Sequence, residues 1–124
     1  MAKILIAEDS ATAAAVLKKA LTGLGHTILL ASDGEEAERQ ISLERPDLVI
    51  LDIIMPKVNG FQLCRIIRSN PALSKLKVIM VTSMDRESDR YWGLKQGADE
   101  YLTKPVDIEE LKTKVRRHLD HGLL

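Results

Sequence analysis

The sequence has a single cysteine, Cys64, among 124 residues. One cysteine forms no internal disulfide, and a lone thiol is typical of a protein from a reducing compartment. An excess of one charge sign is also missing, because 18 Lys and Arg residues face 18 Asp and Glu residues. Zero net charge argues against a protein that bulk electrostatics hold on nucleic acid. We therefore expect no direct nucleic-acid partner.

Long hydrophobic runs are missing as well. The N-terminal stretch MAKILIAEDS carries only a short apolar run after its lysine. This run is too short for the core of a secretory signal and far too short to span a bilayer. The sequence also shows no internal repeat, low-complexity tract or linker. Together these absences predict a cytoplasmic protein without membrane contact, with one domain over residues 1–124.

The residues that are present have the balance of an ordinary globule, with 45% hydrophobic and 29% charged residues. A chain of this length buries roughly two thirds of its unfolded surface, so its core needs no covalent staples. Short apolar runs alternate with longer amphipathic stretches. The runs predict strands buried on both faces of a parallel sheet. They are Lys3–Ala7, His26–Ala31, Asp47–Asp52, Lys77–Thr82 and a weaker Asp99–Leu102.

The amphipathic stretches predict helices. In the first, apolar residues recur at helical spacing, and Gly25 stands where a C-terminal cap is expected. Pro46 stops the second, and Asp107 is placed to cap the fifth. Five strands that alternate with five helices predict an α/β fold, a doubly wound parallel sheet in a three-layer α/β/α sandwich. The expected helices are Ala11–Leu24, Glu35–Glu44, Phe61–Ser69, Arg86–Gln96 and Ile108–His118.

Polar side chains follow four of the five predicted strands. Ligand sites in doubly wound folds lie at the carboxyl ends of the strands, so these side chains are expected to converge. Three carboxylates, one hydroxyl and one ammonium would meet there. In chain order the residues are Glu8 with Asp9, then Asp52, Thr82 and Lys104.

Such a cluster predicts metal-assisted phosphoryl transfer. Close carboxylates raise one another's pKa unless a cation joins them. No His or Cys accompanies these acids, and an all-oxygen ligand set suits Mg²⁺, for which Mn²⁺ could substitute. The lysine supplies a second positive charge. A metal ion, an ammonium and a carboxylate nucleophile together are typical of phosphoryl-transfer sites.

Four motifs surround these residues: EDS at Glu8–Ser10, LDIIMPKVNG at Leu51–Gly60, VTS at Val81–Ser83 and GADEYLTKP at Gly97–Pro105. In their order and spacing they resemble the receiver domain of bacterial two-component response regulators, over essentially the whole chain. Each motif alone is weakly specific, and the set is strongly specific. The resemblance implies a flavodoxin-like sheet with strand order 2-1-3-4-5.

The resemblance also implies roles for the acids. Asp52 is expected to accept a phosphoryl group from the phosphohistidine of a sensor histidine kinase or a histidine phosphotransfer protein. Mg²⁺ would be held by Glu8, Asp9, Asp52 and the backbone carbonyl of Ile54. Lys104 is expected to pair with the phosphoryl oxygens, after a cis peptide bond to Pro105.

The resemblance implies a switch beyond the acids. Thr82 would donate its hydroxyl to a phosphoryl oxygen, and Tyr101 would turn inward as Thr82 moves. These contacts exist only in the active arrangement, so phosphorylation would shift the population toward it. The face built by the fourth helix, fifth strand and fifth helix, about residues 85–118, would bind a downstream target protein.

Several side chains have expected roles outside this core set. Ile54 and Met84 are expected to flank the phosphate, and we predict that they hinder water and slow loss of the acyl phosphate. Trp92 has two open interpretations, core packing and partner contact on the readout face. Cys64 is expected to be a small core residue. The histidines are expected to face solvent without metal-ligand spacing; they are His26, His118 and His121.

Three functional classes stay open at this point. The leading one is a signalling module without an output domain, which acts on a partner or drains a shared kinase. Its stretch Asp85–Pro105 resembles single-domain regulators of surface motility. The second is a receiver cut from a longer DNA-binding regulator or hybrid kinase. The third, a magnesium phosphatase with an aspartyl-phosphate intermediate, is disfavoured because Ile54 stands where that chemistry needs a general acid. We therefore expect a switch and not an enzyme.

Overall fold

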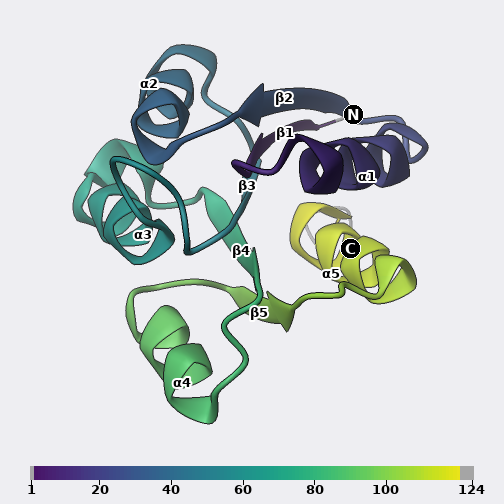
Figure 1. The fold of residues 1–124 in the computed structure, drawn as a ribbon. Coiled ribbons are helices and arrows are strands. Elements are labelled where there is room, and N and C mark those ends of the chain that lie inside the picture. The colour runs from purple at the N-terminus through teal and green to yellow at the C-terminus, as the bar shows by residue number, and fades with distance from the viewer. Residues whose placement is uncertain (1, 121–124) are drawn as a thin grey trace.

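A parallel sheet runs through the centre of the molecule (Figure 1). The computed structural model describes residues 2–120. Within them the sheet has five strands in the order β2-β1-β3-β4-β5, which confirms the expected doubly wound topology. The strands are β1 (Lys3–Ala7), β2 (Thr27–Ala31), β3 (Leu48–Leu51), β4 (Lys77–Thr82) and β5 (Glu100–Thr103).

Helices cover both faces of the sheet and complete three layers. Figure 1 shows α2, α3 and α4 on one face and α1 and α5 on the other. All five predicted helices are present, with bounds within a few residues of those expected. They are α1 (Ala11–Thr22), α2 (Gly34–Glu44), α3 (Gly60–Ser69), α4 (Glu87–Lys95) and α5 (Ile108–Asp120), with a short 3₁₀ helix η1 (Pro71–Leu73) after α3.

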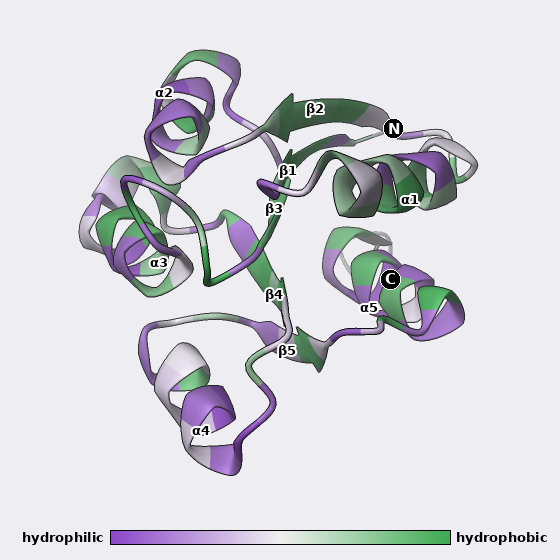
Figure 2. Cartoon of the chain, viewed as in Figure 1, coloured by the Kyte–Doolittle hydropathy of each residue, from purple (hydrophilic) through white to green (hydrophobic). Residues whose placement is uncertain are grey.

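β1 and β3 are almost wholly apolar because they lie inside the sheet, where helices cover both faces (Figure 2). Alternate side chains of one strand therefore enter two separate cores. Full burial of each such Ile or Leu stabilises the fold by about 1.5–3 kcal/mol. The core under α1 and α5 includes Ile4, Ile6, Leu48, Ile50 and Val81, and the core under α2, α3 and α4 includes Leu5, Ala7, Val49, Leu51 and Val78.

The end of α1 lies earlier than the sequence pattern predicts. The helix stops at Thr22 and not at Leu24. The reason is local, because the amides of Leu24 and Gly25 donate to carbonyls three residues back, those of Leu21 and Thr22. This tighter turn ends the α-helical pattern. Gly25 then lies in the connecting turn at φ +89°, where its missing side chain avoids strain.

The expectation that His118 faces solvent is wrong. Its Nε2 lies 2.7 Å from Oε2 of Glu100 on β5, and both side chains are largely buried. Burial alone would raise the pKa of Glu100, but the His118 contact and the charges of Lys114 and Arg117 lower it below its ordinary value. This group ties α5 to β5.

The other two histidines have different outcomes. The ring of His26 is half-buried, and its Nδ1 accepts from the Ala2 amide at 3.2 Å. His121 lies outside the described residues.

None of the helices between residues 2 and 120 is long and apolar enough to cross a membrane.

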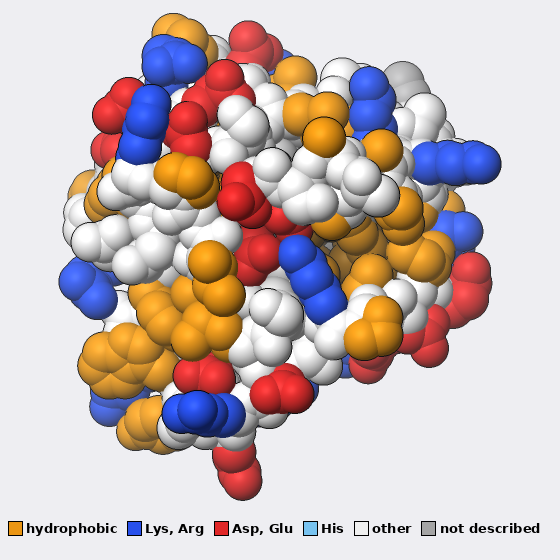
Figure 3. Space-filling model, viewed as in Figure 1, with side chains coloured by type: hydrophobic (Ala, Val, Ile, Leu, Met, Phe, Trp, Pro, Cys, Tyr) orange, Lys and Arg blue, Asp and Glu red, His pale blue; other side chains and the backbone are white. Residues whose placement is uncertain are grey.

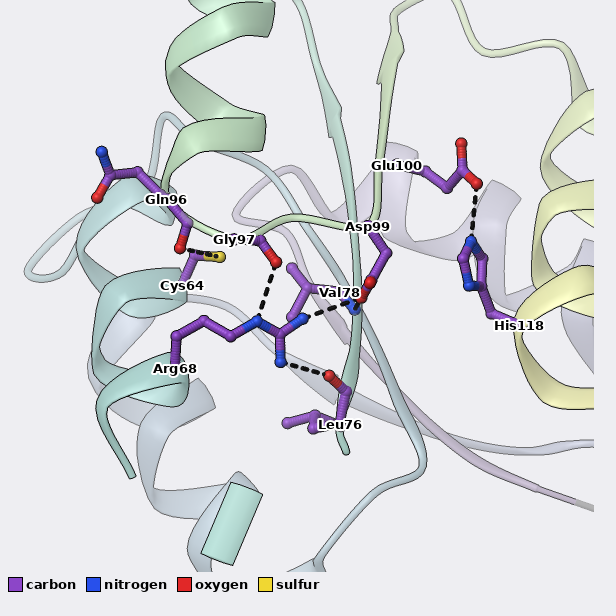
Figure 4. Close-up of polar contacts among 9 residues, drawn as sticks. All are labelled: Cys64, Arg68, Leu76, Val78, Gln96, Gly97, Asp99, Glu100 and His118. Carbon is purple, nitrogen blue, oxygen red and sulfur yellow. Dashed lines mark hydrogen bonds and ion pairs between the residues drawn. The ribbon is translucent and has the colours of Figure 1, made fainter. Parts of the chain in front are cut away.

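Arg68 on α3 binds three other segments through one guanidinium group (Figure 4). Its Nη1 donates to the Leu76 carbonyl at 2.7 Å, and its Nε donates to the Gly97 carbonyl at 2.9 Å. Its Nη2 donates to Asp99 Oδ2 at 2.9 Å, and the same oxygen accepts from the Val78 amide. Arg68 therefore joins α3 to the start of β4 and to the turn after α4.

Replacement of Arg68 by Met should destabilise the fold by about 1.5–3 kcal/mol, because two carbonyls and a carboxylate lose a charged donor. Urea unfolding followed by circular dichroism measures the change. Arg39→Met is the matched control, since that side chain is 60% exposed and its nitrogen lies 3.8 Å from Glu36. We expect the control to stay within about 0.5 kcal/mol. Equal losses in the two variants would contradict the structural role of Arg68.

Candidate functional site

Polar side chains meet at the carboxyl edge of the sheet. The register pairs Ala7 of β1 with Leu51 of β3, so Glu8 and Asp52 follow neighbouring strand ends. The Asp52 amide donates to the Ala7 carbonyl at 3.1 Å and extends this pairing by one residue. Figure 3 shows acidic side chains gathered near the centre of this face, next to a basic one.

The three predicted acids come together as the sequence indicated. One carboxylate oxygen from each of Glu8, Asp9 and Asp52 lies within 4.8 Å of the other two. Glu8 and Asp52 are buried, with exposed fractions of 4% and 6%, whereas Asp9 is exposed. Apart from Tyr101, the polar side chains buried within residues 2–119 are those of Glu8, Asp52 and Thr82. Burial of polar groups is therefore concentrated at this one site.

Lys104 bridges two of these acids. Its Nζ donates to Glu8 Oε1 at 2.5 Å and to Asp52 Oδ2 at 2.8 Å. Burial alone would lower the pKa of Lys104, but the bonds to Asp52 and Glu8 outweigh burial and raise the pKa above its ordinary value. The side chain therefore stays cationic near neutral pH. The Lys104–Pro105 peptide bond is cis, as expected.

Burial makes the negative charge of Glu8 costly. Burial raises its pKa, and the bond from Lys104 and the 3.0 Å bond from the Ser10 amide only partly oppose this. The nearby charge of Asp52 raises the pKa further. One ammonium does not neutralise three carboxylates, so a second cation would stabilise the cluster.

The donor set fits a hard divalent ion. All three side chains offer oxygen, and Asp9 leaves one side of the cluster open to solvent. Mg²⁺ binds through a few carboxylates, keeps several waters and accepts phosphate oxygens. The amide of Ile54 donates to Asp52 Oδ1 at 3.2 Å, which places its backbone beside the cluster. That the Ile54 carbonyl is a further ligand stays a prediction.

Thr82 and Tyr101 both contact the turn after β4. The Thr82 side chain is fully buried, and its Oγ1 accepts from the Met84 amide at 3.3 Å. The Tyr101 hydroxyl donates to the Met84 carbonyl at 2.6 Å. The tyrosine already lies inward, 2% exposed, and burial raises its pKa to about 12. The two residues expected to switch therefore share Met84 as a common partner.

The side chains expected to flank the phosphate lie near the site. Ile54 is 57% exposed next to Asp52, and Met84 is half-buried against the core under α4.

Cys64 is buried in α3, as predicted, and burial raises the pKa of its thiol to about 11. Trp92 is 45% exposed on α4.

Gly60 shapes the site by its close approach to Asp52, and the sequence analysis did not identify this role. A Cβ at this position would lie 2.4 Å from the Asp52 carbonyl oxygen, so only glycine lets α3 begin this close to Asp52. The motif LDIIMPKVNG contains Gly60, but spacing alone gives no reason for it.

The fold and the site together define a protein of the flavodoxin-like class with a receiver-type acidic centre. A family model for the response regulator receiver domain matches residues 4–116. The chain therefore belongs to the response regulator receiver family of two-component signalling.

The relatives extend this assignment. The chain is 45% identical to Protein PilH of Pseudomonas aeruginosa, over 90% of this chain and 92% of PilH. It superposes with a TM-score of 0.92 on a putative response regulator from Chloroflexus aurantiacus, at 34% identity over 97% of this chain and 98% of that one. It also matches the longer transcriptional regulatory protein PhoP of Bacillus subtilis at 36% identity, over 92% of this chain and 47% of PhoP.

One solved neighbour bears on the metal. The receiver domain of the sensor histidine kinase PA1611 from Pseudomonas aeruginosa carries a magnesium ion coordinated in its active-site cleft. It shares 29% identity with this chain over 94% of this chain and 95% of its own, with a TM-score of 0.85. Together with the oxygen cluster described above, it supports Mg²⁺ as the ion that the family uses here.

Addition of Mg²⁺ should raise the melting temperature. At one hundred times its Kd the ion adds about 2.7 kcal/mol of stability by mass action. Asp9→Asn removes one ligand and should abolish most of the rise, which differential scanning fluorimetry measures. Asp47→Asn is the matched control, because Asp47 lies at the opposite edge, where it accepts from the Lys3 amide. A full rise in Asp9→Asn would rule out this metal site.

Proposed function

We propose that this chain is a phosphorylation switch whose acceptor is Asp52. The observation that carries the proposal is the bridge from Lys104 to Asp52 and Glu8, beside the exposed carboxylate of Asp9. An ammonium and an acid cluster around one buried carboxylate form a site for phosphoryl transfer from a phosphohistidine. The donor is a sensor histidine kinase or a histidine phosphotransfer protein.

The transfer requires one bond to form and one to break. A carboxylate oxygen of Asp52 attacks phosphorus and the phosphorus–nitrogen bond breaks. The imidazole nitrogen takes the bonding electron pair, and the ring, protonated on its other nitrogen, leaves as neutral imidazole. Asp52 becomes an acyl phosphate. Mg²⁺, when bound, neutralises negative charge on the transferring group.

Lys104 has a direct role in this step. Its ammonium already contacts the acceptor carboxylate at 2.8 Å and stabilises the phosphoryl oxygens as they arrive. We expect it to exchange its contact with Glu8 for the phosphate when the phosphoryl group arrives. Glu8, Asp9 and Asp52 would hold the metal, together with the backbone carbonyl of Ile54.

The switch follows from contacts that the phosphate adds. The Thr82 hydroxyl donates to a phosphoryl oxygen and gives up the Met84 amide, which frees the turn that Tyr101 also holds. A shift from 1:99 to 99:1 needs about 5.5 kcal/mol of differential interaction. A hydrogen bond and a charge pair in a partly shielded site supply energy of this order.

The readout surface is the face of α4, β5 and α5. Tyr91 and Trp92 on α4 are 61% and 45% exposed, and exposed aromatic side chains are typical anchors of protein interfaces. This exposure favours the partner contact over core packing for Trp92. The target is a protein, and the similarity of Asp85–Pro105 to single-domain regulators favours a component of surface motility. We place the reaction in the cytoplasm.

The two alternative functional classes, a longer regulator and a phosphatase, are not equally well supported. The match to less than half of PhoP keeps open that the domain acts within a longer regulator. We propose a switch and not a turnover enzyme, because Ile54 offers no proton where a phosphatase needs an acid. Turnover of a phosphomonoester would instead favour the phosphatase.

Incubation with acetyl phosphate and Mg²⁺ should add one phosphoryl group on Asp52, found by intact mass and peptide mapping under mild conditions. Asp52→Asn should take up none, because an amide is not a nucleophile here. Asp47→Asn, at the other edge of the sheet, should be modified like the unaltered protein. Modification mapped to another residue, or retained in Asp52→Asn, would refute the proposal.

Polar replacements beside the site should shorten the life of the acyl phosphate. Ile54→Asn and Met84→Glu each open an approach for water, and we expect decay about tenfold faster, equivalent to about 1.4 kcal/mol in the barrier. Loss of phosphoprotein over time, followed by Phos-tag electrophoresis, measures the rate. Leu43→Asn is the control, since Leu43 is 73% exposed near the C-terminal end of α2. Lifetimes equal to that of the control would exclude the shielding role.

A further inference from the structure

Gly93 lies inside α4, two residues before its end, and is the buried residue of that helix. Glycine is the least favourable residue after proline in a helix interior, so a packing reason is expected. The structure supplies one. A Cβ at position 93 would lie 2.8 Å from Cδ2 and 2.9 Å from Cε2 of Tyr101. Real Cβ atoms do not approach a ring this closely. The backbone of α4 therefore packs directly against the Tyr101 ring at position 93, with no side chain between them.

The Tyr101 ring is enclosed on its other sides as well. The Arg90 guanidinium lies 5.6 Å from the ring centroid, and the hydroxyl is bonded to Met84. Met80 on β4 also approaches position 93, with its Sδ 2.9 Å from the same hypothetical Cβ. Methionine is flexible and can give way, but an aromatic ring cannot bend. The ring therefore occupies a slot whose depth is set by Gly93.

α4 cannot simply move away from the ring, because its C-terminal end is fixed to α3. The Cys64 Sγ donates to the Gln96 carbonyl at 3.4 Å, and Arg65 Nε donates to Gln96 Oε1 at 2.9 Å. Arg68 holds the next carbonyl, that of Gly97 (Figure 4). Three donors on one helix therefore hold the turn that ends α4.

We infer that Gly93 is a positioning residue for Tyr101: it creates the slot that admits the ring and couples the ring's position to that of α4. A side chain at position 93 would drive the ring outward. The part of this inference that concerns signalling rests on the proposed function, because it assumes that the position of Tyr101 controls the readout face. The slot itself does not depend on phosphorylation.

The position of the ring can be read from ¹⁹F NMR of protein labelled with 3-fluorotyrosine. The chain has two tyrosines, and Tyr91→Phe assigns the signals. In the unaltered protein we expect a soluble nitroxide to broaden the signal of Tyr91, which is 61% exposed, and to spare Tyr101. In Gly93→Ala the Tyr101 signal should move and broaden severalfold more. Gly23→Ala is the matched control, because a Cβ there meets nothing closer than 3.5 Å.

A folded Gly93→Ala protein whose Tyr101 signal keeps its shift and its protection would overturn the inference. The phosphorylation assay is independent of this result, because the NMR measurement uses protein that is not phosphorylated. Failure of phosphorylation would therefore refute the switch and leave the slot unaffected.

A thermal-unfolding cycle covers the case in which Gly93→Ala folds poorly. Tyr101→Val removes the ring atoms that meet position 93 and retains strand propensity. Gly93→Ala should lower the melting temperature of the unaltered protein and should leave unchanged or raise that of Tyr101→Val, since Ala is the better helix former. An equal fall in both backgrounds would show that contact with Tyr101 is not the reason for glycine.

Discussion

The Lys104 ammonium between Glu8 and Asp52 is the interaction on which the site depends. Two buried carboxylates beside a third would repel one another strongly in the low dielectric of the sheet edge. The ammonium makes their proximity tolerable, with bonds of 2.5 and 2.8 Å. The same proximity leaves the cluster short of positive charge. A site that is stable but under-neutralised is suited to bind a divalent ion and then a phosphoryl group.

The fold produces this arrangement through strand order. Parallel strands bring residues that are far apart in the chain to one edge, and Lys104 reaches Glu8 across 96 residues of sequence. The central positions of β1 and β3 place Glu8 and Asp52 between helical layers, where water is largely excluded. Lys104 follows the edge strand β5, from which its long side chain reaches inward. Thr82 ends β4 and Tyr101 lies within β5, so both residues of the proposed switch are on the strands that follow β3 in the sheet.

Much of this was predictable from the sequence, for identifiable reasons. Period and length of apolar runs predicted β1 and β4 with their observed bounds. The rule that ligands bind at carboxyl strand ends then predicted that Glu8, Asp9 and Asp52 converge, without any knowledge of side-chain direction. The motifs added the strand order and the cis bond before Pro105.

The remainder depends on packing that no sequence pattern records. The pairing of His118 with Glu100 depends on how α5 is rotated about its axis relative to β5. Hydrophobic periodicity predicts this rotation too coarsely to place one side chain. The early end of α1 reflects a choice between two hydrogen-bond patterns that are close in energy. The inward Tyr101 and the slot at Gly93 depend on the distance between α4 and the sheet. A glycine inside a predicted helix was the one available signal for that contact.

The most direct test of the central interaction is a crystal structure with Mg²⁺ and beryllofluoride, a mimic of the phosphoryl group. We predict the ion within about 2.1 Å of oxygens from Asp9 and Asp52. We predict the mimic on Asp52, with the Lys104 ammonium moved from Glu8 onto its fluorine atoms. An ion bound elsewhere, or a lysine that keeps both of its carboxylate contacts while the mimic occupies Asp52, would contradict the role assigned to this site.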